Sequence, residues 1–271
     1  MEPANNTPAL WDALWQRNET DLEADRYDLA KEEASVRWRR MEERIGAKFG
    51  SFKGLEVIEI GAGRGTNGAL MARRGAHVSV LDYSETALVA ARKFFERNGV
   101  EANYILADAL NLEHASTSNK FDISMSFGLA EHFKNSARHR IIDAHFDVLK
   151  PGGMTFISVP NAHNPPYRFY KFVAERIGKW NVGEEIPFSR SELARICKKL
   201  GYSDFEFFGD SFGESFRFIN PLVIMSKLFN RTSMRTPVKP QRGSRLDAHF
   251  AYALILSCGK PIVETTKALV A

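Results

Sequence analysis

Short apolar segments alternate with longer segments of helical periodicity from about residue 55 to residue 210. This alternation is typical of a parallel sheet whose two faces are covered by helices. Gly75, Gly99 and Gly201 each follow an expected helix, where glycine is the usual C-terminal cap. The expected strands are 55–60, 76–81, 102–106, 121–126, 153–159, 203–208 and 250–258, and the expected helices are 66–74, 84–97, 136–149, 164–178 and 190–200.

Two further regions lie outside this alternation. Residues 9–49 are strongly charged with apolar side chains at helical spacing, which predicts an amphipathic cap. Residues 210–249 separate the last two strands and predict a helix at about 217–229, then a basic loop at 231–245. We therefore expect a single domain over 1–271 that consists of an N-terminal helical cap (1–50), a cofactor-binding core (51–209), an insertion or lid (210–249) and a last strand with a tail (250–271).

Composition and charge agree with one globular α/β domain. The chain has 271 residues, of which 44% are hydrophobic and 26% charged, and its formal net charge is +4. No apolar run approaches the roughly 20 residues that span a bilayer, and no secretory signal is recognisable. Cys197 and Cys258 lack metal-ligand spacing, so we expect buried thiols in a reducing compartment. These observations predict a cytoplasmic protein that does not bind membranes.

A glycine-rich loop follows the first expected strand, with the sequence EIGAGRG over 59–65. Glycines let the backbone turn sharply and let a ligand approach the main chain, and the next helix presents its N-terminal amides there. The dinucleotide-binding pattern requires a glycine at position 66, where the chain has Thr66. The loop therefore argues against a nicotinamide-dependent oxidoreductase, which remains a weak alternative.

Two aspartates follow the second and third expected strands. Asp82 ends the second strand, where a carboxylate can accept hydrogen bonds from both ribose hydroxyls of an adenosine. Asp108 follows the third strand, where it can accept a hydrogen bond from the adenine amino group. Taken singly, each is also an ordinary turn or capping residue. Their order after the glycine loop favours an adenosine site.

These segments together resemble the class I S-adenosylmethionine-dependent methyltransferases. The segment FDISMSFGLAEHF over 121–133 is similar to the fourth motif of the subgroup related to ubiquinone- and menaquinone-pathway enzymes. VLKPGG over 148–153 is similar to the turn into their fifth strand. The resemblance implies a doubly wound, Rossmann-like α/β sheet of seven strands, with order 3-2-1-4-5-7-6 and an antiparallel last strand.

The resemblance also implies the cofactor and the reaction. The cofactor would be S-adenosylmethionine, with S-adenosylhomocysteine as its product and no metal. The methyl group would pass by in-line displacement to O or N of a small, apolar or aromatic molecule. The expected cofactor-binding residues are Glu59, Gly61, Ala62, Gly63, Gly65, Asp82, Tyr83, Asp108, Ala109 and Phe127.

The catalytic and acceptor-binding residues are less firmly marked. His132 is the candidate general base, because imidazole titrates near neutral pH; a structural role is the alternative, and an anionic acceptor needs no base. Arg64 either holds the methionine carboxylate of the cofactor or points to solvent. Aromatic side chains outside the core sheet suit an aromatic acceptor, although each could simply pack the lid onto the core. The candidate acceptor-binding residues are Trp15, Tyr27, His163, Tyr167 and Tyr170.

Two other functional classes stay open on the sequence alone. The sequence pI near 9.0 and the basic loop permit an RNA or protein methyltransferase, but the basic residues lack interleaved stacking aromatics, so we do not expect nucleic acid as a partner. The weakly marked catalytic residue permits a protein that binds the cofactor without catalysis. The chain is expected to be a monomer or a homodimer.

Overall fold

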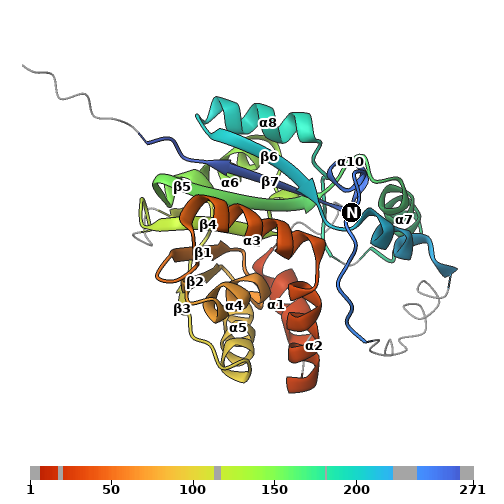
Figure 1. Cartoon of the computed structure of the whole chain (residues 1–271). Helices are drawn as coiled ribbons and strands as arrows, with labels where there is room; N and C mark the ends of the chain where they lie inside the picture. Colours follow the sequence, from red (N-terminus) through yellow and green to blue (C-terminus); the bar gives the residue numbers. More distant parts are fainter. Residues whose placement is uncertain (1–6, 18–20, 113–116, 181, 222–236, 263–271) are drawn as a thin grey trace, which may run out of the picture.

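A central sheet of seven strands organises the molecule (Figure 1). The computed structural model describes residues 7–17, 21–112, 117–180, 182–221 and 237–262. All seven predicted strands are present, with ends that differ by at most a few residues. They are β1 (Glu56–Ile60), β2 (His77–Asp82), β3 (Asn103–Leu106), β4 (Phe121–Phe127), β5 (Leu149–Pro160), β6 (Ser203–Gly209) and β7 (Ala253–Gly259).

The strand order is β3-β2-β1-β4-β5-β7-β6, as the family resemblance implied. The first five strands pair in parallel, and β7 lies antiparallel between β5 and β6. The last strand begins at Ala253 rather than at residue 250, because the short helix α10 (Asp247–Phe250) precedes it. The Asp247 carboxylate accepts hydrogen bonds from the backbone amides of Ser244 (2.6 Å) and Phe212 (2.8 Å), which turns the chain there.

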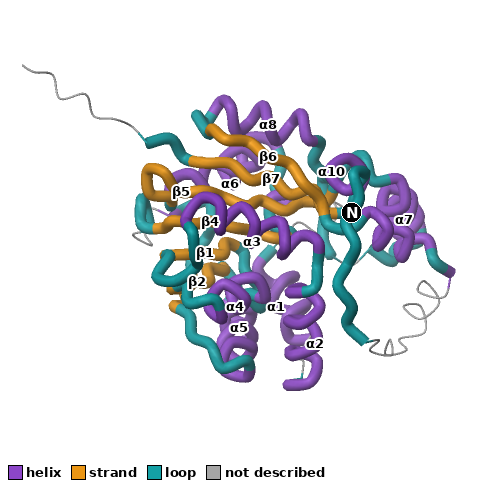
Figure 2. Tube along the Cα trace, viewed as in Figure 1, coloured by secondary structure: helices purple, strands orange, loops and turns teal. Residues whose placement is uncertain are grey.

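Helices cover both faces of the sheet and create two hydrophobic cores (Figure 2). Val57 of β1 packs in one core and Ile58 in the other, because neighbouring strand residues point to opposite faces. On one face lie α3 (Val36–Phe49), α4 and α5, and on the other lie α6 and α8. The helix bounds are α4 (Thr66–Arg73), α5 (Glu85–Arg97), α6 (Asn135–Asp147), α7 (Pro165–Arg176) and α8 (Arg190–Lys199).

The predicted N-terminal cap consists of α1 (Pro8–Arg17), α2 (Leu22–Glu33) and α3 (Val36–Phe49). Ser35 caps α3, since its Oγ accepts a hydrogen bond from the Trp38 amide at 2.9 Å. Trp38, Met41 and Ile45 recur at helical spacing and are fully buried against the sheet. Helix α3 therefore packs in the hydrophobic core that also contains Val57. The proposed division of the chain at residue 50 into a cap and a cofactor-binding core remains a prediction.

The insertion between β6 and β7 begins with a 3-10 helix, η3 (Phe212–Ile219), which packs beside α7. Most of the predicted helix at 217–229 and the first part of the basic loop lie outside the described residues. None of the described helices has both the length and the apolar character that crossing a membrane requires.

Replacement of Trp38 by Ala tests the contribution of α3 to the core. We expect the free energy of unfolding to fall by about 3–5 kcal/mol, because a fully buried indole leaves a cavity. The exposed Arg40 on the same helix is the matched control, and Arg40→Ala should cost less than about 1 kcal/mol. Urea denaturation measures both values. Equal losses in the two variants would contradict the observed packing.

Candidate active site

The glycine loop after β1 has left-handed backbone at Gly61, Gly63 and Gly65. Gly63 (φ +53°) also lies in close contact with α1, since a Cβ there would be 2.3 Å from Trp15 Cζ2. Its amide donates a hydrogen bond to Asp82 Oδ2 at 2.9 Å. A side chain at position 63 would therefore both strain the backbone and displace Trp15.

Glu59 supports this loop from the end of β1. The N-cap position of α4 is Gly65, which has no side chain to accept a hydrogen bond from the helix. Glu59 Oε2 does so instead, accepting from the Gly68 amide at 2.7 Å. Burial of this carboxyl group, which is 3% exposed, raises its pKa to about 8. The predicted cofactor residue Glu59 thus acts as a cap for α4.

A cavity of about 580 Å³, here called the loop cavity, opens beside the glycine loop. Most of the predicted cofactor-binding residues line it; Glu59 and Gly65 do not. The Asp108 oxygens accept hydrogen bonds from the Leu110 amide and the Asn111 side chain, at 2.9 and 2.8 Å. The predicted residues brought together here are Gly61, Ala62, Gly63, Asp82, Tyr83, Asp108, Ala109, Phe127 and His132.

Helix α1 forms one wall of the loop cavity. Trp11 and Trp15 both line it, and the Trp11 ring meets the His132 ring edge to face at 4.9 Å. Asp12 of α1 accepts a hydrogen bond from the hydroxyl of Ser84, which caps α5. The sequence indicated both indoles, whose helical spacing puts them on one face, as part of the acceptor site; the structure places both in the wall of the loop cavity.

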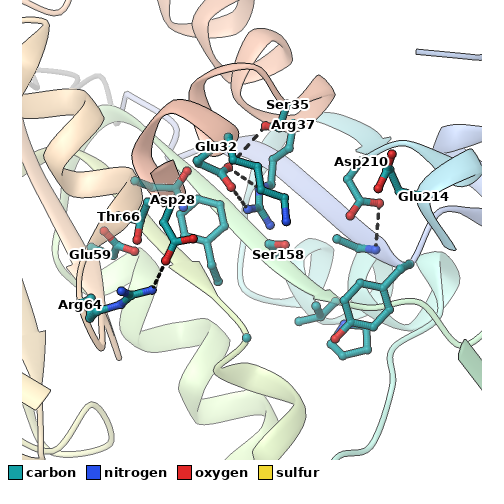
Figure 3. Close-up of a pocket in the computed structure, with 18 of the residues that line it drawn as sticks. Asp28, Glu32, Ser35, Arg37, Glu59, Arg64, Thr66, Ser158, Asp210 and Glu214 are labelled. Carbon is teal, nitrogen blue, oxygen red and sulfur yellow. Dashed lines mark hydrogen bonds and ion pairs between the residues drawn. The ribbon is translucent and has the colours of Figure 1, made fainter. Parts of the chain in front are cut away.

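A second cavity of about 570 Å³, here called the polar cavity, lies beside the first (Figure 3). Arg37 Nε donates to Glu32 Oε1 at 2.8 Å, and the guanidinium lies 5.0 Å from the centre of the Phe127 ring. Burial raises the pKa of Asp210 to about 6, against the opposing effect of Arg37. Sequence reasoning missed these three charged residues, because they come from α2, α3 and the end of β6.

The two cavities meet at a shared wall, here called the junction. It consists of Trp15, Ala62, Phe127 and Gly128. The junction lies at the ends of β1 and β4, which are neighbours in the sheet. The helices that follow these two strands pack on opposite faces of the sheet. Ligands of open α/β sheets bind at such a point. An elongated ligand can therefore occupy both cavities in contact with one edge of the sheet.

Three titratable side chains gather near the junction. A carboxylate oxygen of Glu131, one of Glu185 and a ring nitrogen of His132 lie within 4.8 Å of one another. Glu131 Oε2 is buried without a hydrogen-bond partner among the residues that the structure describes, and burial raises the pKa of Glu131 to about 8. Such a cluster can exchange protons or hold a cation. The sequence prediction of no metal remains a prediction.

The other predicted acceptor-binding residues lie apart from these cavities. Tyr167 is fully buried and donates its hydroxyl to Glu185 at 2.9 Å, and Tyr170 packs on Trp180 and Phe218. His163 is exposed beside a third cavity of about 800 Å³. Tyr27 is half-buried on α2 and is absent from the lining of all three cavities as far as the chain is described. Their proposed roles in acceptor binding rest on sequence alone.

Comparison with known proteins identifies the family. The family profile described as "Methyltransferase domain" matches residues 57–153. The ubiquinone biosynthesis O-methyltransferase of Aromatoleum aromaticum is 33% identical over 185 residues, which are 67% of this chain and 75% of that protein. The chain belongs to the S-adenosylmethionine-dependent methyltransferases. The enzyme of the same description from Aeromonas salmonicida is 32% identical over 176 residues, 59% of this chain and 72% of that protein.

Solved structures of other methyltransferases share this methyltransferase's fold. Magnesium protoporphyrin IX methyltransferase from Synechocystis PCC 6803, solved with bound SAH, has a TM-score of 0.55 at 15% identity and matches over 93% of both chains. An S-adenosylmethionine-dependent methyltransferase from Archaeoglobus fulgidus has a TM-score of 0.52 at 16% identity, covering 82% of this chain and 94% of that one. Identities this low establish the fold alone.

The residues present in the methyltransferase fit its cofactor. Gly61 lines the loop cavity, and a Cβ there would lie 2.6 Å from Leu129 Cδ1, so this position of the cofactor loop requires a residue without a side chain. Asp82 presents a carboxylate to the loop cavity, as a ribose diol requires. On the polar side, Glu59 and Asn67 line the cavity, and Asn67 Oδ1 is buried without a partner in the described part of the chain. These polar groups suit the methionine portion.

The raised pKa of Glu59 predicts how stability depends on pH. Its folded pKa of about 8 lies above its ordinary value of 4.5, so its contribution to stability is present below pH 4.5 and is lost as the pH rises through 8. Glu59→Gln keeps an acceptor for Gly68, so we expect it to lose less stability between pH 5 and pH 9 than wild type. Denaturation across this range measures the difference. Exposed Glu43→Gln is the control, and identical slopes for Glu59→Gln and wild type would contradict the assignment.

Proposed function

We propose that the protein transfers the methyl group of S-adenosylmethionine to a hydroxyl oxygen of a small molecule that binds at the Asp210 end of the polar cavity, opposite the Glu59 end that suits the methionine portion of the cofactor (Figure 3). The observation that carries this proposal is the junction, where a cavity suited to an adenosine meets a second, hydrogen-bonding cavity. The names of the relatives support oxygen as the atom methylated, since those proteins are O-methyltransferases.

The lining of the polar cavity supports a hydroxylated aromatic acceptor with polar substituents. Phe127 and Tyr252 offer ring faces, whereas Arg37, Asp210 and Arg217 offer charges of both signs. A ring could pack on the first pair while its substituents reach the charged groups. The sequence led us to expect an apolar or aromatic acceptor, whereas the lining of this cavity suits an acceptor with polar substituents. Because the charges are of both signs, they favour a small polar molecule over the uniformly negative phosphates of RNA.

When bound, S-adenosylmethionine supplies a methyl group on a sulfonium, ready for in-line displacement. The chain aligns the reactants and excludes water, which lowers the barrier through proximity. Asp82 would hold the ribose, the loop amides would contact the cofactor backbone, and the indoles of α1 would close the loop cavity. Phe127 and Gly128 would line the place where the methyl group meets the acceptor oxygen, since both residues line both cavities.

We propose that His132, which lines the loop cavity and not the polar cavity, acts at the junction as the base that removes the acceptor proton. Its Nδ1 lies 2.9 Å from the Glu184 carbonyl oxygen, which can only accept, so Nδ1 carries the proton and Nε2 the lone pair. Burial lowers the pKa of His132 below its ordinary value of 6.5, which keeps the ring neutral at pH 7. Nearby Glu131 and Glu185 could pass the proton on.

We also propose that the protein acts in the cytoplasm, as a monomer or a homodimer. Cys197 and Cys258 are both buried free thiols, which supports a reducing compartment.

Methyl transfer to catechol and to aniline tests the choice of oxygen directly. The two probes share a ring and differ in the nucleophile, and S-adenosylmethionine with a labelled methyl group reports the product. We expect labelled catechol ether and no labelled aniline. Methylated aniline without any ether, or no transfer to any hydroxylated aromatic tested, would contradict the proposal.

Replacement of Asp82 by Asn tests the cofactor site. The loss of a charged acceptor for the ribose hydroxyls should weaken S-adenosylhomocysteine binding at least about tenfold, measured by calorimetry. Asp122→Asn is the matched control, because Asp122 pairs with Lys150 and lines neither cavity. Equal affinities for wild type and Asp82→Asn would remove Asp82 from the site.

Replacement of His132 by Ala tests the base. We expect kcat to fall by about 10²-fold or more, because general base catalysis contributes at this level. Wild-type kcat/KM should fall below pH 6.5 as the imidazole becomes protonated, and the variant should lack this limb of the profile. His139→Ala, on the exposed surface of α6, is the control. An unchanged rate and profile in His132→Ala would show that the acceptor needs no base from this residue.

A further inference from the structure

Arg64 is the one residue between Gly63 and Gly65 in the cofactor loop, and its side chain extends to α2 (Figure 3). Its guanidinium lies 3.3 Å from Asp25 Oδ1 and 2.7 Å from Asp28 Oδ2. It also lies over the Phe94 ring, 5.5 Å from the centre. The side chain is 21% exposed, so it does not simply point to solvent, and two carboxylates already neutralise its charge.

Asp25 makes this contact strong. Its side chain is 1% exposed and has a second cationic partner, Arg97 of α5, at 3.0 Å. The two cationic partners offset the cost of burying this carboxylate, so removal of either one leaves its charge only partly compensated. Arg64 therefore ties α2 to the loop, whereas Arg97 ties the same carboxylate to a helix outside both cavities.

The same helix builds a wall of the polar cavity. Beyond Asp28, the next turn of α2 places Lys31 and Glu32 in the lining. Glu32 in turn fixes Arg37, whose guanidinium lies over Phe127 at the junction. A continuous series of contacts thus leads from the backbone that faces the cofactor to the ring that separates the two cavities.

We propose that Arg64 is a positioning residue that couples the cofactor loop to the acceptor wall through α2. The inference rests on the proposed function, because it takes the polar cavity as the acceptor site. Contact of the cofactor with the loop backbone would restrict the position of Arg64. Arg64 holds α2 in place through Asp25 and Asp28, and α2 in turn positions Glu32 and, through it, Arg37. Cofactor binding consequently stabilises the acceptor wall further, although its contacts are already formed in the free protein.

Hydrogen–deuterium exchange tests the coupling without an acceptor. In wild type, S-adenosylhomocysteine should protect amides of both the loop–α4 segment (59–73) and the α2–α3 segment (22–37). In Arg64→Ala, the first segment should remain protected and the second should lose its protection. Arg97→Ala is the matched control, because it removes a partner of the same Asp25 but leaves the loop contact, and its α2 protection should persist.

Kinetics with catechol as the probe distinguishes a role of Arg64 in positioning the acceptor wall from direct binding of the cofactor by Arg64. For Arg64→Ala we expect the KM for catechol to rise about tenfold, the size of an ordinary coupling effect, while kcat and the affinity for S-adenosylhomocysteine change less than about threefold. Arg64→Lys, which keeps the charge but not the two-pronged contact, should rescue part of the loss. Asp28→Asn gives a second route if Arg64→Ala fails to fold, and it should show the same split.

Each outcome decides the proposal. A collapse of S-adenosylhomocysteine affinity in Arg64→Ala would show that Arg64 binds the cofactor itself and would overturn it. Unchanged α2 protection in Arg64→Ala, or in Asp28→Asn where that variant replaces it, would overturn it as well. If wild type methylates no hydroxylated probe, the proposed function fails, and the exchange experiment still decides whether Arg64 couples the two segments.

Discussion

The turn after β1 is the constraint on which the site depends. The chain must leave a buried strand, expose its backbone and enter α4 within a few residues. Three glycines in left-handed conformation allow that turn, and Glu59 replaces the cap that Gly65 cannot provide. Asp82 then ties the loop to the neighbouring strand through Gly63. Because these contacts are internal to the protein, the loop is shaped before any ligand arrives, which reduces the ordering cost of binding.

The features that could be predicted from the sequence are those that depend on local residue types or on periodic apolar patterns. Strand positions followed from apolar alternation, and the loop and Asp82 followed from residue types that must occupy the ends of parallel strands. The last strand was placed three residues early, because Asp247 forms side-chain contacts with Phe212 and Ser244 that create α10. Local patterns carry no information about such contacts between distant segments.

The acceptor side was predicted poorly for the same reason. Glu32, Arg37 and Asp210 are ordinary charged residues in the sequence and become a cavity wall only when three segments meet. Tyr167 and Tyr170 were chosen for their aromatic character, but a ring that packs and a ring that binds have the same sequence signal. The structure shows both rings packed against neighbouring aromatic residues, and their predicted role in binding remains untested.

We propose that cofactor and acceptor meet at the junction of the two cavities. A crystal structure of the protein with S-adenosylhomocysteine and catechol would show where each one binds. We expect adenosine in the loop cavity beside Asp82, the sulfur beside Phe127 and Gly128, and the catechol hydroxyl in the polar cavity. Adenosine in the polar cavity, or catechol bound away from the junction, would contradict it.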